Sequence, residues 1–213
     1  MNKVITMLGL ALGLMSASLW AQQPPPGTPA FKETLATKAL LEQVRKGGFV
    51  LYMRHGNTDN SRPDRAPAVD LNDCATQRPL NDEGRRVTAE VGKAIRAARL
   101  PLGDIFVSPM CRAKESATAA FGTGFQVNNN LMYTANLTTA QKKPILETTR
   151  KLLSEPVPAG VNRVIVAHAP NMADLMGFFV KPEGTVVVIR PKGNGEFEYV
   201  ASIHPTLWPE LLR

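Results

Sequence analysis

The sequence has little cysteine, little histidine and few aromatic residues. It contains two cysteines, Cys74 and Cys111, and three histidines, none of which lies near a cysteine at the spacing of a zinc site. Aromatic residues make up 6% of the chain and are not interleaved with basic residues, which argues against a nucleic-acid surface. No second long apolar run follows the first residues, so we expect no integral membrane span in the mature chain. The sequence therefore predicts no metal site and no nucleic-acid partner.

The overall composition is that of a globular protein. With 44% apolar and 20% charged residues, 213 residues suffice for one domain with a sizeable core. Lys and Arg number 25 and Asp and Glu number 18, which gives a formal net charge of +7. This excess suits an anionic partner but does not select one, because scattered basic residues commonly do no more than solvate a surface.

The first residues have the pattern of a secretory signal peptide. Lys3 precedes an apolar run over 4–15, and small residues follow at 16–18. The run is too short to cross a hydrocarbon core of roughly 30 Å as a helix, so a retained anchor is the minor alternative. We predict a signal peptide over residues 1–21, an extended proline-rich linker over 22–30 and one domain over 31–213. The protein would then be exported, to the periplasm or as a secreted protein.

Both cysteines belong to the predicted mature chain. Export would carry them into an oxidising compartment, where a disulfide between Cys74 and Cys111 is plausible and two buried thiols are the alternative. In the chain-entropy model, such a bond would contribute roughly 4 kcal/mol by restricting the denatured state. Nothing in the sequence indicates the oligomeric state.

Strands and helices alternate along the predicted domain. Three short apolar runs, 49–53, 105–107 and 163–167, are typical of buried strands, and each is followed by a polar or charged segment and then a helix. The expected helices cover 34–46, 80–98, a segment capped by Ser108 with Pro109 in its first turn and ending near Phe121, and a segment from Pro170 with Met172, Leu175, Met176 and Phe179 on one face. A helix after Thr138 is less clear, because Pro144 interrupts it.

A hairpin is expected at the end of the chain. The turn Gly193-Asn194-Gly195 separates two segments with strand character, 185–189 and 197–203. Together with the alternating strands and helices, this predicts an α/β fold, a three-layer α/β/α sandwich with a mainly parallel central sheet and a C-terminal hairpin. Residues 57–79 lack an apolar period and predict a long surface loop of the kind that often has a function.

The segments that follow the three strands carry the chemically important residues. Arg54 and His55 follow the first strand, the segment 108–112 with Arg112 follows the second, and His168 follows the third. Ligands bind beyond the carboxyl ends of parallel strands, so we expect these residues to form one cationic pocket. Guanidinium groups match the oxygens of a phosphoryl group and a neutral imidazole can attack phosphorus. The pocket therefore predicts phosphoryl chemistry.

Four segments of the chain carry a family resemblance. They are LYMRHGNT at 51–58, PLNDEGR at 79–85, VSPMCRA at 107–113 and VAHAPN at 166–171. In this order and spacing they resemble the histidine phosphatase superfamily, which includes the phosphoglycerate mutases. The resemblance runs from Phe49 to about Phe179 and is to the small, secreted bacterial members with a single domain and paired cysteines.

The resemblance implies a role for each matching residue. His55 would be the catalytic nucleophile that becomes phosphohistidine, while Arg54, Arg112 and His168 would hold the phosphoryl oxygens through transfer and hydrolysis. Water would then release phosphate, and no metal or organic cofactor is implied. The substrate would be a phosphorylated small molecule or an envelope component.

The proton donor for the leaving group is where the sequence departs from many members of the superfamily. Residues 121–141 contain no acid, and His168 is followed by Ala169. Glu183 and Asp59 are the candidates for a catalytic acid, and each also fits an exposed acid on a loop.

Other polar residues near the nucleophile are candidates for substrate binding. Asn57 and Thr58 follow His55 closely enough to offer hydrogen bonds to phosphate, although short polar residues also suit turns. Arg62, and with it Arg65 and Arg78, would recruit a second anionic group or simply solvate the loop. His204, the third histidine, is expected to be a surface or structural residue.

The sequence thus favours an exported phosphatase that acts on phosphomonoesters through a phosphohistidine intermediate. The alternative is a binding protein of the same fold that keeps the anion pocket without turnover, which the missing proton donor motivates. A mutase and a nucleic-acid protein are weaker alternatives, because export removes the chain from glycolytic substrates and from nucleic acid.

Overall fold

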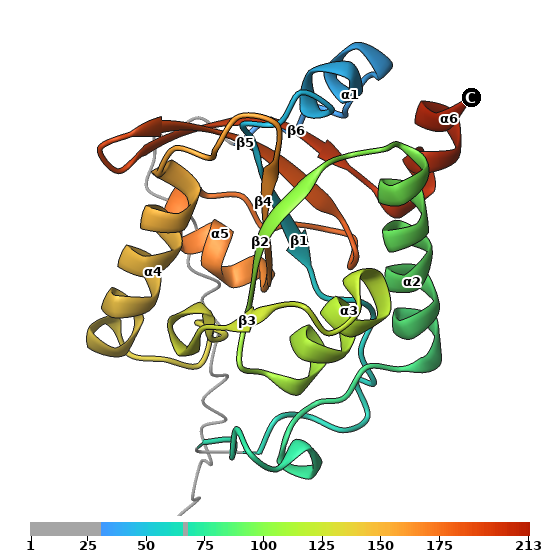
Figure 1. Ribbon diagram of the computed structural model, residues 1–213. Helices are drawn as coiled ribbons and strands as arrows, with labels where there is room; N and C mark the ends of the chain where they lie inside the picture. Colours follow the sequence, from blue (N-terminus) through green and yellow to red (C-terminus); the bar gives the residue numbers. More distant parts are fainter. Residues whose placement is uncertain (1–30, 66–67) are drawn as a thin grey trace, which may run out of the picture. The chain divides into compact units, whose positions relative to one another are not determined.

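The computed structural model describes residues 31–65 and 68–213 (Figure 1). The predicted signal peptide over 1–21 and the linker over 22–30 lie outside the described residues. No helix in the described part of the chain is both long and apolar enough to span a bilayer.

A single six-stranded sheet forms the centre of the domain. Its strands are β1 Val50–Arg54, β2 Leu102–Val107, β3 Gln126–Val127, β4 Asn162–Ala167, β5 Val186–Gly193 and β6 Glu196–Ile203. They lie in the order β3-β2-β4-β1-β5-β6, in which β3, β2, β4 and β1 run parallel and the hairpin of β5 and β6 is antiparallel. The predicted sheet and closing hairpin are confirmed.

Helices cover both faces of the sheet, as predicted for a three-layer sandwich. They are α1 Lys38–Val44, α2 Asp82–Ala97, α3 Cys111–Phe121, α4 Thr139–Ser154, α5 Ala169–Met176 and α6 Trp208–Leu212. In Figure 1, α4 and α5 lie on one face, and α2 and α3 lie on the other with α6.

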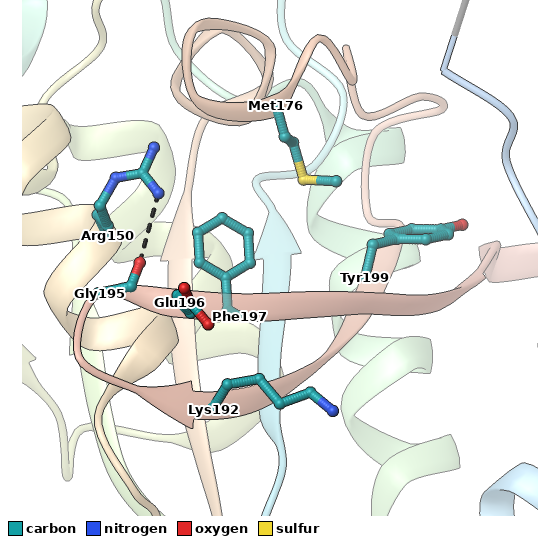
Figure 2. Close-up of a pocket in the computed structure, with 7 residues that line it drawn as sticks. All are labelled: Arg150, Met176, Lys192, Gly195, Glu196, Phe197 and Tyr199. Atoms are coloured by element: carbon teal, nitrogen blue, oxygen red, sulfur yellow. Dashed lines mark hydrogen bonds between the residues drawn. The ribbon is translucent and has the colours of Figure 1, made fainter. Parts of the chain in front are cut away.

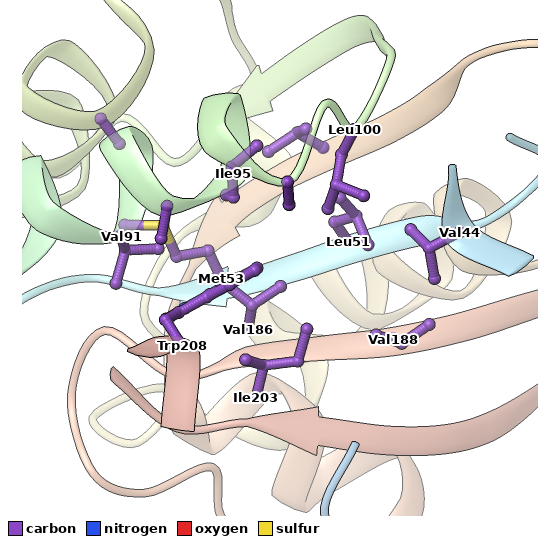
Figure 3. Close-up of a cluster of buried hydrophobic side chains, with 14 of the residues drawn as sticks. Val44, Leu51, Met53, Val91, Ile95, Leu100, Val186, Val188, Ile203 and Trp208 are labelled. Carbon is purple, nitrogen blue, oxygen red and sulfur yellow. The ribbon is translucent and has the colours of Figure 1, made fainter. Parts of the chain in front are cut away.

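Alternate side chains of β1 belong to two separate hydrophobic clusters, one on each face of the sheet. Leu51 and Met53 point toward α2 and α6, where Val91, Ile95 and Trp208 complete the packing (Figure 3). Val50 and Tyr52 point to the opposite face, where the second cluster includes side chains of α4 and α5. Burial on both faces explains why this strand is an unbroken apolar run.

The helices α1, α4 and α5 differ in extent or continuity from the sequence prediction. α1 begins at Lys38 and not at Thr34, because Thr37 caps it and the preceding residues hydrogen-bond to Ser202 of β6. α4 continues through Pro144, which lies within its first two turns behind a capping box formed by Thr138 and Gln141. α5 ends at Met176 with Gly177 in the left-handed conformation, so Phe179 lies beyond the helix and is 50% exposed.

The two cysteines form the predicted disulfide. Cys74 lies in the loop over 57–79, and Cys111 opens α3, with their Cα atoms 5.8 Å apart. The side chain of Gln77 reinforces this connection, since its Oε1 accepts the backbone N–H of Cys111 at 2.8 Å. The loop is thereby attached to the helix turn that carries Arg112.

Removal of this disulfide is expected to lower the free energy of unfolding by about 2–4 kcal/mol, because the denatured chain gains freedom. Cys74→Ser is the cleaner variant, since Cys74 is exposed whereas Cys111 is buried. Urea unfolding of the oxidised wild type, the reduced wild type and Cys74→Ser measures the effect. Reductant should leave the variant unchanged, and equal stability of oxidised and reduced wild type would contradict the prediction.

Candidate active site

The carboxyl ends of β1, β2 and β4 bring the predicted site residues together. His55 follows β1 directly and His168 follows β4, and their ring centroids lie 5.2 Å apart. Arg112 enters from the first turn of α3 and is fully buried, as is His168, while His55 is 2% exposed. The structure therefore brings these three predicted site residues together at one edge of the sheet.

His55 is held as a neutral imidazole. Its Nδ1 lies 2.8 Å from the carbonyl oxygen of Gly56, which favours the tautomer with the proton on Nδ1 and leaves the lone pair on Nε2. Burial, and then the positive charge of Arg112, lowers the pKa of His55 well below 6.5. An unprotonated Nε2 is the form of imidazole that can attack phosphorus.

His168 is oriented by a residue whose role the sequence did not indicate. Its Nε2 lies 2.7 Å from Oγ of Ser108, while its Nδ1 is buried and has no hydrogen-bond partner in the described chain. If the Ser108 hydroxyl donates to Nε2, Nδ1 carries the ring proton and can donate to an anion. The pKa of His168 is lowered well below 6.5 by burial, and next by the charge of Arg112.

The prediction that Ser108 caps α3 is therefore wrong. Met110 occupies the N-cap position and makes no side-chain cap. The hydroxyl of Ser108 faces His168 instead, because a buried imidazole nitrogen has few other partners.

Arg54 and Arg112 share one arrangement of contacts. Arg54 donates through Nη1 to the carbonyl oxygen of Val180 at 2.7 Å and pairs through Nη2 with Glu183. Arg112 donates through Nη1 to Oδ1 of Asp64 at 2.9 Å. In each case Nε is buried without a partner, and so is Nη2 of Arg112.

A third arginine, Arg78, belongs to the same cluster. Its Nε is also buried without a partner, and its charge is among the causes that lower the pKa of both His55 and His168. The sequence placed Arg78 only beside a long loop, and no periodic or local signal distinguished it from Arg62 and Arg65.

These donors give the cluster the chemistry that suits an anion. Buried N–H groups are nearly always hydrogen-bonded, and a group of them without protein partners is typical of a functional site. Here the group comprises Nε of Arg54, Arg78 and Arg112, Nη2 of Arg112 and Nδ1 of His168. A tetrahedral oxyanion beside His55 would satisfy several of them at once.

Two glycines allow the nucleophile loop to reach α2. A Cβ on Gly56 would lie 2.5 Å from the carbonyl oxygen of Gly84, and a Cβ on Gly84 would lie 2.1 Å from that of Asn57. The backbone N–H of Gly56 donates to Oγ of Ser116 on α3 at 3.0 Å. Two of the four resembling segments are thus in backbone contact, and any larger residue at either glycine would displace His55.

The predicted phosphate-binding residues next to His55 contribute mainly through the backbone. The carbonyl oxygen of Asn57 accepts the N–H of Asn81 at 3.1 Å, and Thr58 forms an isolated bridge with Leu80. Arg62 is exposed, and its backbone N–H donates to Asp59. No side-chain hydrogen bond joins these three residues to the cluster, so their binding roles stay predictions.

The two candidate acids lie in different settings. Asp59 accepts hydrogen bonds from the hydroxyl and the N–H of Ser61, which lower the pKa of its carboxyl. Glu183 reaches the site, but its carboxylate pairs with Arg54. Among the described residues no group of His, Cys, Asp and Glu is arranged to hold a metal ion.

A cavity of about 150 Å³ adjoins the cluster. Asp64 and Tyr133 belong to both, since the Tyr133 ring lies 5.1 Å from the Arg112 guanidinium and 5.5 Å from the His168 ring. Met110, Met132 and Leu137 add apolar lining. The cavity is therefore suited to the non-phosphate part of a ligand.

A separate groove lies on the C-terminal hairpin (Figure 2), and its lining residues are Arg150, Met176, Lys192, Gly195, Glu196, Phe197 and Tyr199. None of its lining residues belongs to the cluster around His55. Lys192 and Glu196 carry opposite charges, and Phe197 and Tyr199 pack against the second hydrophobic cluster. The groove therefore has no group of reactive side chains comparable to that of the histidine site.

A family model matches the part of the chain that carries most of these residues. Residues 50–132 match the family model described as histidine phosphatase superfamily (branch 1), a range that includes Arg54, His55, Arg78 and Arg112 and ends before His168. No curated protein sequence matches the chain.

Solved structures give the same assignment at the level of the fold. The protein histidine phosphatase SixA complexed with tungstate has a TM-score of 0.53 at 16% identity, covering 74% of this chain and 97% of its own. Rv3214 from Mycobacterium tuberculosis has a TM-score of 0.54 at 15% identity, covering 72% and 96%. A putative phosphohistidine phosphatase SixA from Nakamurella multipartitia has 0.51 at 18%, covering 74% and 96%. The predicted resemblance to the superfamily and its fold are confirmed.

The buried histidines predict how stability depends on pH. An unfolded histidine has a pKa of about 6.5, whereas both folded pKa values lie well below it, so the unfolded chain binds more protons between these limits. The free energy of unfolding should therefore fall as the pH drops below about 6.5, by up to about 1.4 kcal/mol per pH unit for each histidine. Above that pH these groups contribute no dependence.

Urea unfolding of wild type and His55→Asn, from about pH 8 to about pH 5, measures this dependence. The variant should show a shallower slope, because one proton-linked group is gone. His204→Asn is the matched control, since His204 pairs with Glu33 away from the cluster and lies one-quarter exposed. Equal slopes for wild type and His55→Asn would contradict the account.

Proposed function

We propose that this chain, which matches the histidine phosphatase superfamily over residues 50–132 and has the superfamily's fold, is an exported phosphatase acting on phosphomonoesters. The observation that carries the proposal is a neutral imidazole, His55, buried among arginine N–H groups that no described residue satisfies. This combination binds a phosphoryl group and presents a nucleophile to it.

The reaction proceeds in two displacements at phosphorus. Nε2 of His55 attacks, the bond from phosphorus to the ester oxygen breaks, and the leaving oxygen takes the electron pair and a proton, which produces the alcohol and phosphohistidine. Water then attacks phosphorus, the N–P bond breaks, and the electron pair returns to Nε2. Phosphate leaves, and the proton lost by the water goes to solvent.

The cationic donors stabilise the charge that develops on the phosphoryl oxygens. Nε of Arg54 and the Nε–Nη2 edge of Arg112 are positioned before substrate arrives, because their other nitrogens are already bound to protein. Donors fixed in advance need no reorganisation as charge builds up, which is the main source of electrostatic catalysis. When the Ser108 hydroxyl donates to Nε2 of His168, the ring proton lies on Nδ1 and provides a further donor.

Proton donation to the leaving group does not require Glu183. Its carboxylate is bound to Arg54, which suits orienting that arginine better than supplying a proton. A leaving group that departs easily needs no acid, and otherwise water can supply the proton, because His168 is neutral at neutral pH. The adjoining cavity of about 150 Å³ has room for a compact alcohol portion.

Substitution of His55 tests the proposal. Wild type should release phosphate from members of a broad phosphomonoester panel, whereas His55→Ala should lose at least about 10³-fold in kcat/KM, because the covalent route is gone. Brief incubation with a ³²P-labelled substrate followed by alkaline quenching should label wild type but not His55→Ala. His204→Ala should behave as wild type.

Two outcomes would contradict the proposal. Failure of wild type to release phosphate from every ester would remove the phosphatase assignment, and stoichiometric binding of inorganic phosphate without turnover would favour the binding-protein alternative. Turnover by His55→Ala at the wild-type rate would show that His55 is not the nucleophile.

The proposed export can be tested by the location and the N-terminus of the expressed protein. Expression of the full chain in a bacterial host should yield a periplasmic or secreted protein that begins close to Gln22, because the first 21 residues have the signal-peptide pattern. Cell fractionation and the intact mass of the purified protein measure this outcome. A mass that retains Met1 in the cytoplasmic fraction would contradict export.

A further inference from the structure

Asp64 contacts two of the site arginines although no motif includes it. Its Oδ1 accepts from Nη1 of Arg112 at 2.9 Å and from the backbone N–H of Arg78 at 2.8 Å. The Asp64 side chain is 12% exposed, whereas that of Arg112 is fully buried. This carboxylate is thus the only acid paired with Arg112 in the described part of the chain.

The contact determines which edge of Arg112 remains available. A guanidinium offers its donors in a fixed planar fork, and an edge with two nitrogens matches two oxygens of a phosphoryl group. With Nη1 bound to Asp64, the available edge is the pair Nε and Nη2, and both atoms are buried without a partner. The ring of Tyr133, whose centroid is 5.1 Å from the guanidinium carbon, lies over the group.

The loop that carries Asp64 is itself anchored near Arg112. The disulfide attaches Cys74 to Cys111, the residue before Arg112. The backbone N–H of Arg65, next to Asp64, donates to the carbonyl oxygen of Thr76 at 2.9 Å. Asp64 is therefore connected to Arg112 both by its side chain and through the covalent link between loop and helix.

Glu183 has the same relation to Arg54. It binds Nη2 while Val180 accepts from Nη1, and Nε remains without a partner. Arg54 at the end of β1 and Arg112 in the first turn of α3 are thus each paired with an acid of a loop, and Nε is left available in both. The repetition of one arrangement at two arginines argues for orientation as the purpose of the acids.

We propose that Asp64 is a positioning residue that orients the guanidinium of Arg112 and fixes the backbone of Arg78 for the phosphoryl group, and that it is not the proton donor. The inference rests on the proposed function, since it names a residue that prepares the same site. Asp64 acts through its acceptor oxygen, so an oxygen at the same place without a negative charge should retain most of the effect.

The test compares Asp64→Ala, which removes the acceptor, with Asp64→Asn, whose amide oxygen can still accept both hydrogen bonds. Calorimetry gives the Kd of inorganic phosphate, and steady-state kinetics give kcat/KM for 4-nitrophenyl phosphate and for an alkyl phosphate. Loss of a charge-assisted hydrogen bond predicts that Asp64→Ala weakens phosphate binding by about 10- to 100-fold. Asp64→Asn should stay within about threefold of wild type, because it keeps the acceptor.

The kinetic pattern separates positioning from proton donation. If Asp64 positions the arginines, Asp64→Ala should lower kcat/KM for the aryl and the alkyl ester by similar factors, because both need the same phosphoryl contacts. If Asp64 is the donor, Asp64→Asn should be as defective as Asp64→Ala on the alkyl ester and both should keep activity on the aryl ester, which would overturn the proposal. Unchanged phosphate affinity in Asp64→Ala would also overturn it.

Controls keep the result interpretable. Asp82→Ala removes a fully exposed carboxylate at the start of α2 and should leave all constants unchanged. If Asp64→Ala does not fold, Asp64→Glu moves the acceptor by one methylene and should weaken phosphate binding, and wild-type affinity in that variant would contradict positioning. Phosphate binding can be measured without turnover. If wild type binds phosphate but does not hydrolyse esters, the proposed function is wrong, whereas the effect of Asp64 on phosphate affinity can still be measured.

Discussion

The buried charge of Arg112 is the constraint on which the rest of the site depends. A fully buried guanidinium is costly unless it is paired and hydrogen-bonded. Asp64 binds one of its nitrogens and leaves two donors without a partner. The same charge helps to lower the pKa of His55 and of His168, so both imidazoles are neutral at neutral pH. The buried guanidinium of Arg112 thus favours binding of an anion and helps to keep the His55 imidazole unprotonated.

The fold supplies this arrangement from distant parts of the chain. Because β1, β2 and β4 are parallel neighbours, the residues after each strand meet at one edge of the sheet. Backbone contact between Gly56 and Gly84 brings the nucleophile loop against α2, and the disulfide connects the following loop to α3. Packing of two hydrophobic clusters on the faces of the sheet holds these elements in place.

Features with a regular pattern were predictable from sequence, and features that depend on a tertiary partner were not. The apolar runs of β1 and β4 and the turn at Asn194 have local signals, and the parallel topology then brings His55 and His168 together. Ser108 before a proline has the pattern of a helix cap, but the buried nitrogen of His168 takes its hydroxyl. The first residues expected in α1 pair instead with β6, a contact between the two ends of the domain that helical periodicity cannot reveal.

The side-chain positions in the loop over 57–79 could not be predicted from the sequence. Arg62, Arg65 and Arg78 have equivalent local sequence, yet only Arg78 has a buried Nε beside the histidines. Asp64 resembles any other loop acid until its contact with Arg112 is known. Both placements depend on the disulfide and on contacts between the loop and α3, which no local pattern encodes.

A crystal structure of the protein with orthovanadate would show directly whether His55 and the arginines bind one oxyanion together. We expect vanadium to be bonded to Nε2 of His55, with its oxygens accepting from Nε of Arg54, from Nε and Nη2 of Arg112 and from Nδ1 of His168. An oxyanion bound elsewhere, or one that contacts His55 only through Nδ1, would contradict this expectation.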